Sequence, residues 1–390
     1  MKVLLARDFA GIYAEPCSPD APFGAPGTEN QTYLHARHLR ELGCEVCVIG
    51  NIAKDTQREG IKFLKLEGFR EARDFVQEMH PDLMIAEGGS FFLRTLGTHL
   101  DAVLSKKLKN TYFLQVMHNL PLWEFHIRPD YIDYWCYVCE SQKFLHKVRP
   151  SFDLFNSSFL ETVYSKTPDA KKKMQFVVVG SVEKPGTLEA ITAIQDLQKD
   201  YDLQAFFLMP EWGSPNFAEL QARYPKIEFK NFNPRELARL LKESMAVISS
   251  FYPWEQCPVT ILDSYAAGTL CITGGNGSLQ YLNPAGIRCR MEELGDVLRW
   301  VIHNPEACTA LGQRGLAHLK RSHHVESAQK EQLRYILEYL PTHEKPGYLQ
   351  KQYNKFIFGT DKNLKIRWAR RRFSELRFAI QHRTWQADVY

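Results

Sequence analysis

The sequence lacks several patterns, and each absence argues against a class of protein. No window approaches the roughly 18 uninterrupted apolar residues that a membrane-spanning helix requires. There is no G-x-x-x-x-G-K-[S/T] phosphate loop, and no G-x-G-x-x-G follows the first predicted strand, which disfavours a nicotinamide-type Rossmann enzyme. The opening residues MKVLLARDFA have an apolar run too short for a signal peptide, and they predict a first β-strand instead.

Cysteine is present in an odd number, nine, which favours reduced thiols and a cytoplasmic protein over a disulfide framework. The pairs Cys44-x-x-Cys47 and Cys136-x-x-Cys139 have the spacing of zinc or redox motifs. Cys44 and Cys47, however, flank or lie in an apolar strand, and no nearby His completes a ligand set. We therefore interpret these cysteines as buried thiols and predict no metal site.

Positive charge is concentrated at the C-terminal end. The net charge is +4, but Pro341 to Tyr390 alone contain 11 Lys/Arg against 4 Asp/Glu, so the first 340 residues are slightly acidic. A near-neutral body argues against nucleic-acid binding. The basic tail is a candidate for contact with an acidic partner, including an anionic membrane surface.

Strands and helices are predicted to alternate along the chain, which is typical of parallel sheets covered by helices on both faces. Predicted strands are Val3–Ala6, Glu45–Ile49, 61–65, Pro81–Ala86, Thr111–Val116, Phe176–Val179, Gln204–Met209, Ile227–Phe229, Ala246–Ser249 and Leu270–Thr273. Predicted helices are Glu29–Leu42, 69–79 and Gly186–Gln198. The fold class is therefore α/β, with two doubly wound Rossmann-like halves.

A polar stretch, Tyr164–Lys173, is the best candidate for a linker, because the strand–helix pattern restarts after it. With 390 residues, the chain is long enough for two domains. We predict an N-terminal domain over 1–165, a C-terminal domain over 166–340 and a basic tail over 341–390.

The most informative segment is WEQCPVTILDSYAAG, from Trp254 to Gly268. It follows a predicted strand and opens a helix, with Glu255 in the loop. Pro258 suits a first helical turn, where a missing N–H costs nothing. The free N–H groups of Val259 and Thr260 can bind phosphate oxygens. Asp263 lies about one turn further along and can accept hydrogen bonds from a ribose diol.

This arrangement of two acids eight positions apart, with Pro between and Ala-Gly after, resembles the signature of retaining GT-B glycosyltransferases, the family 4-like group also called glycosyl transferases group 1. Glu255 fits the first acid of that signature, and Asp263 stands where the family usually has Glu. The alternative for the segment on its own is an amphipathic helix with two surface acids.

Further matches occur in the order that the resemblance requires. The run VVVGSVEKPG, from Val177 to Gly186, resembles the first strand and loop of the donor domain, including Gly180. The family places an Arg and a Lys there to neutralise the donor diphosphate. Lys184 fits the Lys, whereas Ser181 stands roughly where the Arg belongs. The alternative for Lys184 is a solvated loop lysine.

In the first half, GAPGTEN (Gly24 to Asn30) resembles the family's glycine-rich loop, in which Gly27 permits close backbone approach. It reads equally well as a flexible turn. His118 follows a predicted strand, and the family often has a His there near the donor sugar; a structural His is the alternative. Glu87 and Ser90, after another strand, are weaker candidates for contact with the acceptor.

The resemblance implies a GT-B fold, in which two Rossmann-like domains face each other across a cleft. It implies transfer of a sugar, with retention, from a nucleotide-sugar to a hydroxyl group of a glycan, lipid-linked or small-molecule acceptor. Glu255, His118 and Lys184 would be catalytic. Pro258, Val259, Thr260, Asp263, Gly180, Ser181 and Gly27 would bind the donor. No further cofactor is expected, and no D-x-D has the strand context of the metal-dependent glycosyltransferase fold.

Two other functions remain open at this point. A binding or scaffold protein on a catalytically decayed GT-B fold fits the missing Arg and the Asp at position 263. A nucleotide-sugar epimerase can use the same fold. The tail, in which basic residues alternate with apolar ones between Asn363 and Arg383, fits a membrane-surface helix as well as a helix packing back across the domains. We expect a cytoplasmic protein, with peripheral membrane contact through the tail as one alternative.

Overall fold

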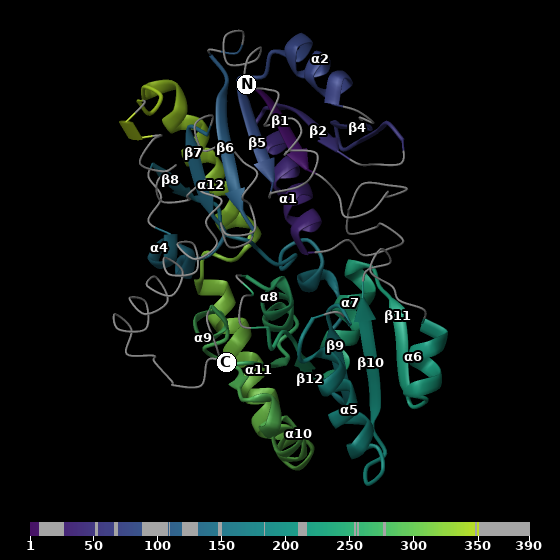
Figure 1. Ribbon diagram of the computed structural model, residues 1–390. Coiled ribbons are helices and arrows are strands. Elements are labelled where there is room, and N and C mark those ends of the chain that lie inside the picture. Colours follow the sequence, from purple (N-terminus) through teal and green to yellow (C-terminus); the bar gives the residue numbers. More distant parts are fainter. Residues whose placement is uncertain are drawn as a thin grey trace, which may run out of the picture. The chain divides into compact units, whose positions relative to one another are not determined.

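The computed structural model describes residues 1–7, 27–50, 54–65, 69–87, 108, 110–118, 132–146, 150–182, 184–209, 217–252, 255, 257–275, 278–347 and 349–350. The expectations for Gly24 to Pro26, for Ser90 and for the tail beyond residue 350 lie outside these residues. The described chain forms two compact units (Figure 1). Unit 1 takes its described residues from 1–12, 36–155 and 332–390, and unit 2 takes them from 13–35 and 156–331.

Unit 1 is built on a sheet in the order β3-β4-β2-β1-β5-β6-β7-β8. Its strands are β1 (Lys2–Arg7), β2 (Glu45–Gly50), β3 (Thr56–Arg58), β4 (Ile61–Lys65), β5 (Leu83–Glu87), β6 (Tyr112–Met117), β7 (Tyr134–Tyr137) and β8 (Ser151–Asp153). Only β3 runs antiparallel to its neighbour. The central strands are buried almost throughout, as strands covered on both faces must be.

The helices of unit 1 follow its strands. They are α1 (Gly27–Glu41), which begins in unit 2, α2 (Phe69–Met79), α4 (Glu140–His146) and the second half of α12 (Glu326–Tyr339). Val76 of α2 packs against Leu4 and Met84 in a core of fully buried side chains. Each such side chain contributes about 1.5–3 kcal/mol through the removal of apolar surface from water.

Unit 2 is built on a parallel sheet in the order β11-β10-β9-β12-β13-β14. Its strands are β9 (Lys173–Val179), β10 (Gln204–Met209), β11 (Ile227–Asn231), β12 (Ser244–Ile248), β13 (Leu270–Thr273) and β14 (Ile287–Arg288). Counted along the chain, this order is 3-2-1-4-5-6, the doubly wound Rossmann order. The parallel strands of unit 1 begin with the same order.

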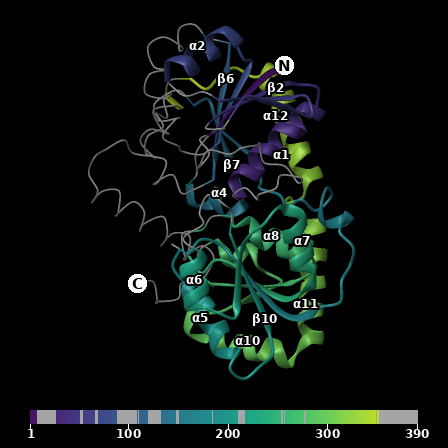
Figure 2. The same cartoon turned by 90° about the vertical axis from the view of Figure 1, so that its right-hand side faces the viewer.

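The helices of unit 2 cover both faces of this sheet (Figure 2). They are α5 (Thr187–Leu197), α6 (Phe217–Arg223), α7 (Pro234–Glu243), α8 (Val259–Ala266), α9 (Leu279–Leu282), α10 (Leu294–His303), α11 (Pro305–Arg321) and the first half of α12. Helix α5 packs on α10, and α8 packs on α11. The start of α7 illustrates the local signals: Asn233 accepts a hydrogen bond from the Glu236 N–H at 2.8 Å, and Pro234 occupies the first turn.

The predicted strands and helices are confirmed, with ends that differ by one to three residues in most cases. Helix 69–79 has the predicted bounds. The helix predicted to open near Pro258 and to end at Gly268 is α8. The short strands β3, β7, β8 and β14 and helices α4, α6, α7 and α9 to α12 had been given no bounds from the sequence. Burial of Cys44, Cys47, Cys136 and Cys139 is also confirmed, and burial raises the pKa of the Cys47 thiol to about 12.

The chain passes from unit 1 to unit 2 at residues 155 and 156, about ten residues before the predicted boundary at 165. It returns to unit 1 inside α12. Aromatic contacts explain the return: Tyr339 packs edge-on against Tyr134 and Phe152 at centroid distances of 6.0 and 5.2 Å. The described residues that follow α12 stay on unit 1, where the Tyr112 hydroxyl donates to the His343 carbonyl at 3.2 Å.

Within the part of the chain that the structure describes, none of the helices has the length and apolar character needed to cross a membrane.

Candidate active site

The carboxyl edge of the unit 2 sheet carries most of the residues that the sequence singled out. In an open α/β sheet, ligands bind outside the carboxyl ends of the strands, at the point where the strand order reverses. In unit 2 this point lies between β9 and β12. The loops after these two strands contain Lys184 and Glu255.

These two residues form an ion pair. The Lys184 ammonium donates to Oε2 of Glu255 at 2.5 Å, although the residues are 71 positions apart in the sequence. The Lys184 side chain is 46% exposed and that of Glu255 is 21% exposed. Within the described residues, no other ion-pair partner is found for either side chain. The structure therefore brings the predicted phosphate-binding cation and the predicted catalytic acid into direct contact.

Close backbone packing holds the two loops against each other. Gly186, just before α5, has φ +89°, a conformation that side chains with a Cβ rarely adopt. A Cβ at Gly186 would lie 2.7 Å from the Cβ of Phe251, which is in the loop after β12. A Cβ at Gly274 would lie 3.2 Å from the Cα of the same Phe251. Phe251 is thus packed between two glycines. The backbone positions of Lys184 and Glu255 are fixed by this packing and by the turn bonds Lys184 N–Ser181 O and Glu255 N–Tyr252 O.

Helix α8 begins beside this pair. Pro258 is its N-cap, one position earlier than the predicted first turn, and it offers no side-chain cap. The amides of Val259 and Thr260 have no intrahelical acceptor, because the first N–H groups of a helix never do. Gly27, at the start of α1, lies in the same unit, and a Cβ there would come within 3.2 Å of Cγ2 of Val259. The starts of the two helices therefore adjoin, and helix starts favour anions.

Asp263 is buried in the second turn of α8. Burial raises the pKa of this carboxyl group to about 7, and a hydrogen bond from Tyr164 acts in the opposite direction. Burial and the charge of Asp263 raise the pKa of the Tyr164 hydroxyl well above its usual range. Within the described residues, Oδ1 of Asp263 has no hydrogen-bond partner. One buried acceptor atom of Asp263 is therefore left unsatisfied by the described residues.

Gly180 and Ser181 follow β9 directly. The Gly180 amide donates to the Leu208 carbonyl of the neighbouring strand at 3.2 Å, so this glycine extends the sheet at its carboxyl edge. Ser181 begins the turn that leads to Lys184. Among the described residues of this loop, Lys184 is the only cationic side chain.

Unit 1 has its own polar cluster at the carboxyl edge of its sheet. Glu87 ends β5, and His118 follows β6. The His118 Nε2 and the Glu87 Oε2 are 2.7 Å apart, and both side chains are fully buried. Nη1 of Arg7, the last residue of β1, donates to the Glu87 carbonyl at 2.5 Å. The structure thus brings together two candidates that the sequence placed only separately at strand ends, and it adds Arg7.

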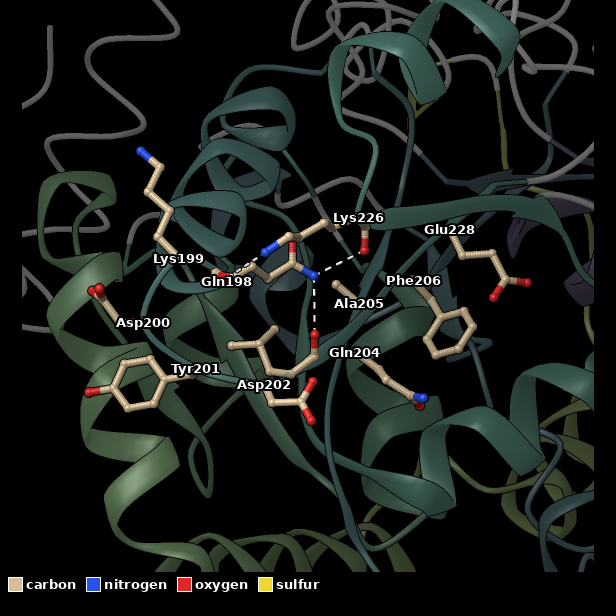
Figure 3. Close-up of a pocket in the computed structure, with 11 residues that line it drawn as sticks. Gln198, Lys199, Asp200, Tyr201, Asp202, Gln204, Ala205, Phe206, Lys226 and Glu228 are labelled. Atoms are coloured by element: carbon tan, nitrogen blue, oxygen red, sulfur yellow. Dashed lines mark hydrogen bonds between the residues drawn. The ribbon is translucent and has the colours of Figure 1, made fainter.

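A separate open cavity of about 600 Å³ lies at the opposite, amino edge of the unit 2 sheet (Figure 3). It is bordered by the turn between α5 and β10 and by the start of β11. Gln198 spans its wall, donating to the carbonyls of Leu203 and Lys226 at 3.2 and 3.0 Å. Asp200 and Asp202 border it as well, and they precede a strand rather than follow one. Because this cavity lies away from the switch point, we assign it no part in the site.

Three residues of the site were not identified from the sequence. Arg7 could have been, since it is a cation at the carboxyl end of a predicted strand. Phe251 and Tyr164 could not, because their contacts with Gly186 and Asp263 join segments that are distant along the chain. Among the described residues, no group of three or more His, Cys, Asp and Glu side chains is arranged to hold a metal ion.

No protein-family model matches this sequence, and no curated protein matches it significantly. Solved structures do match. A glycosyltransferase from Rickettsia africae aligns with a TM-score of 0.60 and 13% identity, over 88% of this chain and 99% of that protein. HepE from Anabaena, in complex with UDP and glucose, aligns with a TM-score of 0.66 and 11% identity, over 87% and 100%. An α-glucosyltransferase in complex with UDP and a 13-mer DNA aligns with a TM-score of 0.62 and 11% identity, over 86% and 99%.

At these identities the likeness concerns the fold. It extends over nearly the whole length of each of the three proteins, and both sheets of this chain have the doubly wound order. The predicted fold class is therefore confirmed: this chain has the GT-B fold of glycosyltransferases, with two Rossmann-like units.

Proposed function

We propose that this protein is a glycosyltransferase that moves a sugar from a nucleotide-sugar to a hydroxyl acceptor with retention of configuration. The observation that carries the proposal is the Lys184–Glu255 pair at the switch point of unit 2, beside the start of α8. An acid and a phosphate-binding cation are needed together wherever a sugar leaves a diphosphate, because negative charge builds on the leaving group. Two of the structures aligned above are complexes with UDP, and HepE also aligns as a complex with UDP-glucose, which favours such a donor.

Each residue has a role in this proposal. Lys184 and the amides of Val259 and Thr260 bind the diphosphate, and Gly27 allows close approach to it. Asp263 accepts a hydrogen bond from the ribose. Glu255 orients the sugar and supports the positive charge that develops on it. The departing phosphate helps to deprotonate the acceptor.

His118, in unit 1, is proposed as a further catalytic residue, and Glu87 fixes the orientation of its ring by the 2.7 Å contact. Gly180, Ser181 and Pro258 shape the donor loops. The proposed reaction needs no metal ion and no further cofactor. We also propose that the protein acts in glycan or glycoconjugate synthesis in the cytoplasm, with the basic tail as a region of peripheral membrane contact.

The first experiment is a thermal-shift and calorimetric screen with UDP, GDP, ADP and dTDP. At least one diphosphate should stabilise the protein, because a ligand that binds only the folded state raises its stability. Lys184→Met should weaken its binding about 10- to 150-fold, the range that corresponds to a charge-assisted hydrogen bond. Lys173→Met, at the amino edge of the same unit, is the matched control and should leave affinity unchanged.

A wild-type protein that binds none of the four diphosphates would favour a scaffold function on a decayed fold. Turnover of a nucleotide-sugar without any acceptor would favour an epimerase. Retention is tested separately by NMR of the anomeric centre of the product, where inversion would contradict the proposal. Transfer that persists in excess EDTA is expected, since no metal takes part.

A further inference from the structure

Lys184 and Glu255 contact each other directly, and this contact affects how a ligand can bind to Lys184. A lysine ammonium has no more than three donors on one compact charge. The Glu255 carboxylate occupies one of them at 2.5 Å. A diphosphate that approaches Lys184 therefore meets a cation that already has an anionic partner.

We infer that Glu255 competes with the nucleotide diphosphate for Lys184, and so makes the protein select the intact donor over the nucleoside diphosphate product. This rests on the proposed function. An intact donor offers a phosphate to Lys184 and sugar hydroxyls to Glu255, so both charges gain a new partner. The product offers a phosphate alone, and Glu255 then loses its cation without compensation. Re-formation of the pair favours product release.

The exposures of the two side chains agree with an exchangeable contact. The 46% exposed Lys184 can rotate to a ligand at small desolvation cost, while the 21% exposed Glu255 remains beside the loop. The backbones below them do not need to move, because Gly186 and Phe251 hold the two loops together. Exposed pairs of this kind have small interaction energies, which a diphosphate can exceed. A fully buried pair could not serve in this way, because a ligand would have to break it at a far larger desolvation cost.

The test measures the affinity of the nucleoside diphosphate that binds best in the screen, by calorimetry at low ionic strength. Glu255→Gln and Glu255→Ala should each bind this diphosphate about two- to fivefold more tightly than the wild type, although Glu255 belongs to the site. Two variants are used because Gln keeps a hydrogen-bonding group and Ala does not. Unchanged or weaker binding in both variants would overturn the inference.

Glu243→Gln is the matched control. Glu243 accepts a hydrogen bond from Lys173 at 2.6 Å and lies in the same unit, where α7 ends, away from the switch point. It should leave the affinity at the wild-type value. An equal gain in Glu243→Gln would mean that the overall charge, and not the contact, is responsible, and this too would overturn the inference.

A double-mutant cycle locates the effect at Lys184. In the Lys184→Met background, Glu255→Gln should no longer tighten binding, because the cation for which it competes is gone. A gain that persists in this background would contradict the competition. Failure of the proposed function looks different: the wild type then binds none of the four diphosphates.

Discussion

The two units use the same strand order to support two different kinds of polar contact. At the carboxyl edge of unit 1, Glu87 and His118 form a pair with no exposed side-chain surface. At the corresponding edge of unit 2, Lys184 and Glu255 form a pair in which both side chains are partly exposed to water. The unit 2 pair joins the two loops that flank the switch point of its sheet, whereas the unit 1 pair joins the ends of β5 and β6.

The difference in burial separates their roles. A buried polar pair has been withdrawn from water, so removal of one member leaves the other without solvation. Its partner atoms are therefore held in place, as a residue that must orient a substrate requires. An exposed pair is screened and weak, and it can exchange its partners for those of a ligand. We therefore expect the unit 1 pair to affect stability and the unit 2 pair to affect binding.

The largest expected effect is in unit 1. Glu87→Ala should lower the free energy of unfolding by about 3–5 kcal/mol, because it removes one member of a fully buried polar pair. Denaturant unfolding followed by intrinsic tryptophan fluorescence, to which Trp135 in the same unit contributes, measures this loss. The control is Glu45→Ala, which removes an exposed acid 4.0 Å from Lys62 in the same sheet. Equal losses in the two variants would remove the contrast between buried and exposed pairs.

The second effect concerns Asp263, a buried acid in the unit with the exposed pair. Its folded pKa of about 7 lies above the unfolded value, so the folded state holds the extra proton. The wild type should therefore lose stability as the pH rises from about 4 to about 7, by at most about 4 kcal/mol. Asp263→Asn lacks this titration, so its stability advantage over the wild type should grow across that range.

The comparison with Asp263→Asn is needed because the titration of His324 changes the stability of the protein with pH in the opposite direction. Burial lowers the pKa of His324 to about 4, so its contribution to stability increases as the pH rises toward 6.5. His324 contributes equally to the wild type and to Asp263→Asn, so its contribution cancels in the difference between their free energies of unfolding. A difference that stays constant between pH 4.5 and 7.5 would show that Asp263 is not a buried acid with a raised pKa.

The third prediction concerns the packing of Gly186, which holds the exposed Lys184–Glu255 pair in place. Gly186→Ala should destabilise the protein by about 1–3 kcal/mol, because it adds a Cβ at φ +89° and 2.7 Å from Phe251. Nucleoside diphosphate affinity should also fall, since the loops of Lys184 and Glu255 are forced apart. Gly275→Ala, where a Cβ meets nothing within 4 Å, is the control and should leave both quantities unchanged. The melting temperature and a binding isotherm measure them.

The smallest expected effect completes the contrast. Lys184→Met should change the free energy of unfolding by less than about 1 kcal/mol, because its ion pair is exposed. The same denaturant measurement as for Glu87→Ala provides the value. A loss as large as that of Glu87→Ala would show that the unit 2 pair is structural.

The long buried strands could be predicted from the sequence alone. Strands covered on both faces must be apolar almost throughout, so they appear in the sequence as short continuous apolar runs. The run Phe176–Val179 and the run Leu270–Thr273 were found in this way. The sequence did not predict β8, which has three residues, or β14, which has two, because no pattern of apolar and polar residues can develop over so few positions. The return of the chain to unit 1 inside α12 gave no signal in the sequence, because it depends on aromatic contacts between distant segments.

The sequence by itself determined which residues could carry the chemistry. Strand ends and helix starts are local signals, and they led to Glu87, His118, Lys184, Glu255 and Val259 one at a time. Only the tertiary structure decided which of them meet, because contacts such as that between Lys184 and Glu255 depend on strand order and on the close packing of two loops. It also decided that one pair is buried and the other exposed, since burial follows from everything that packs around a side chain and not from its neighbours along the chain.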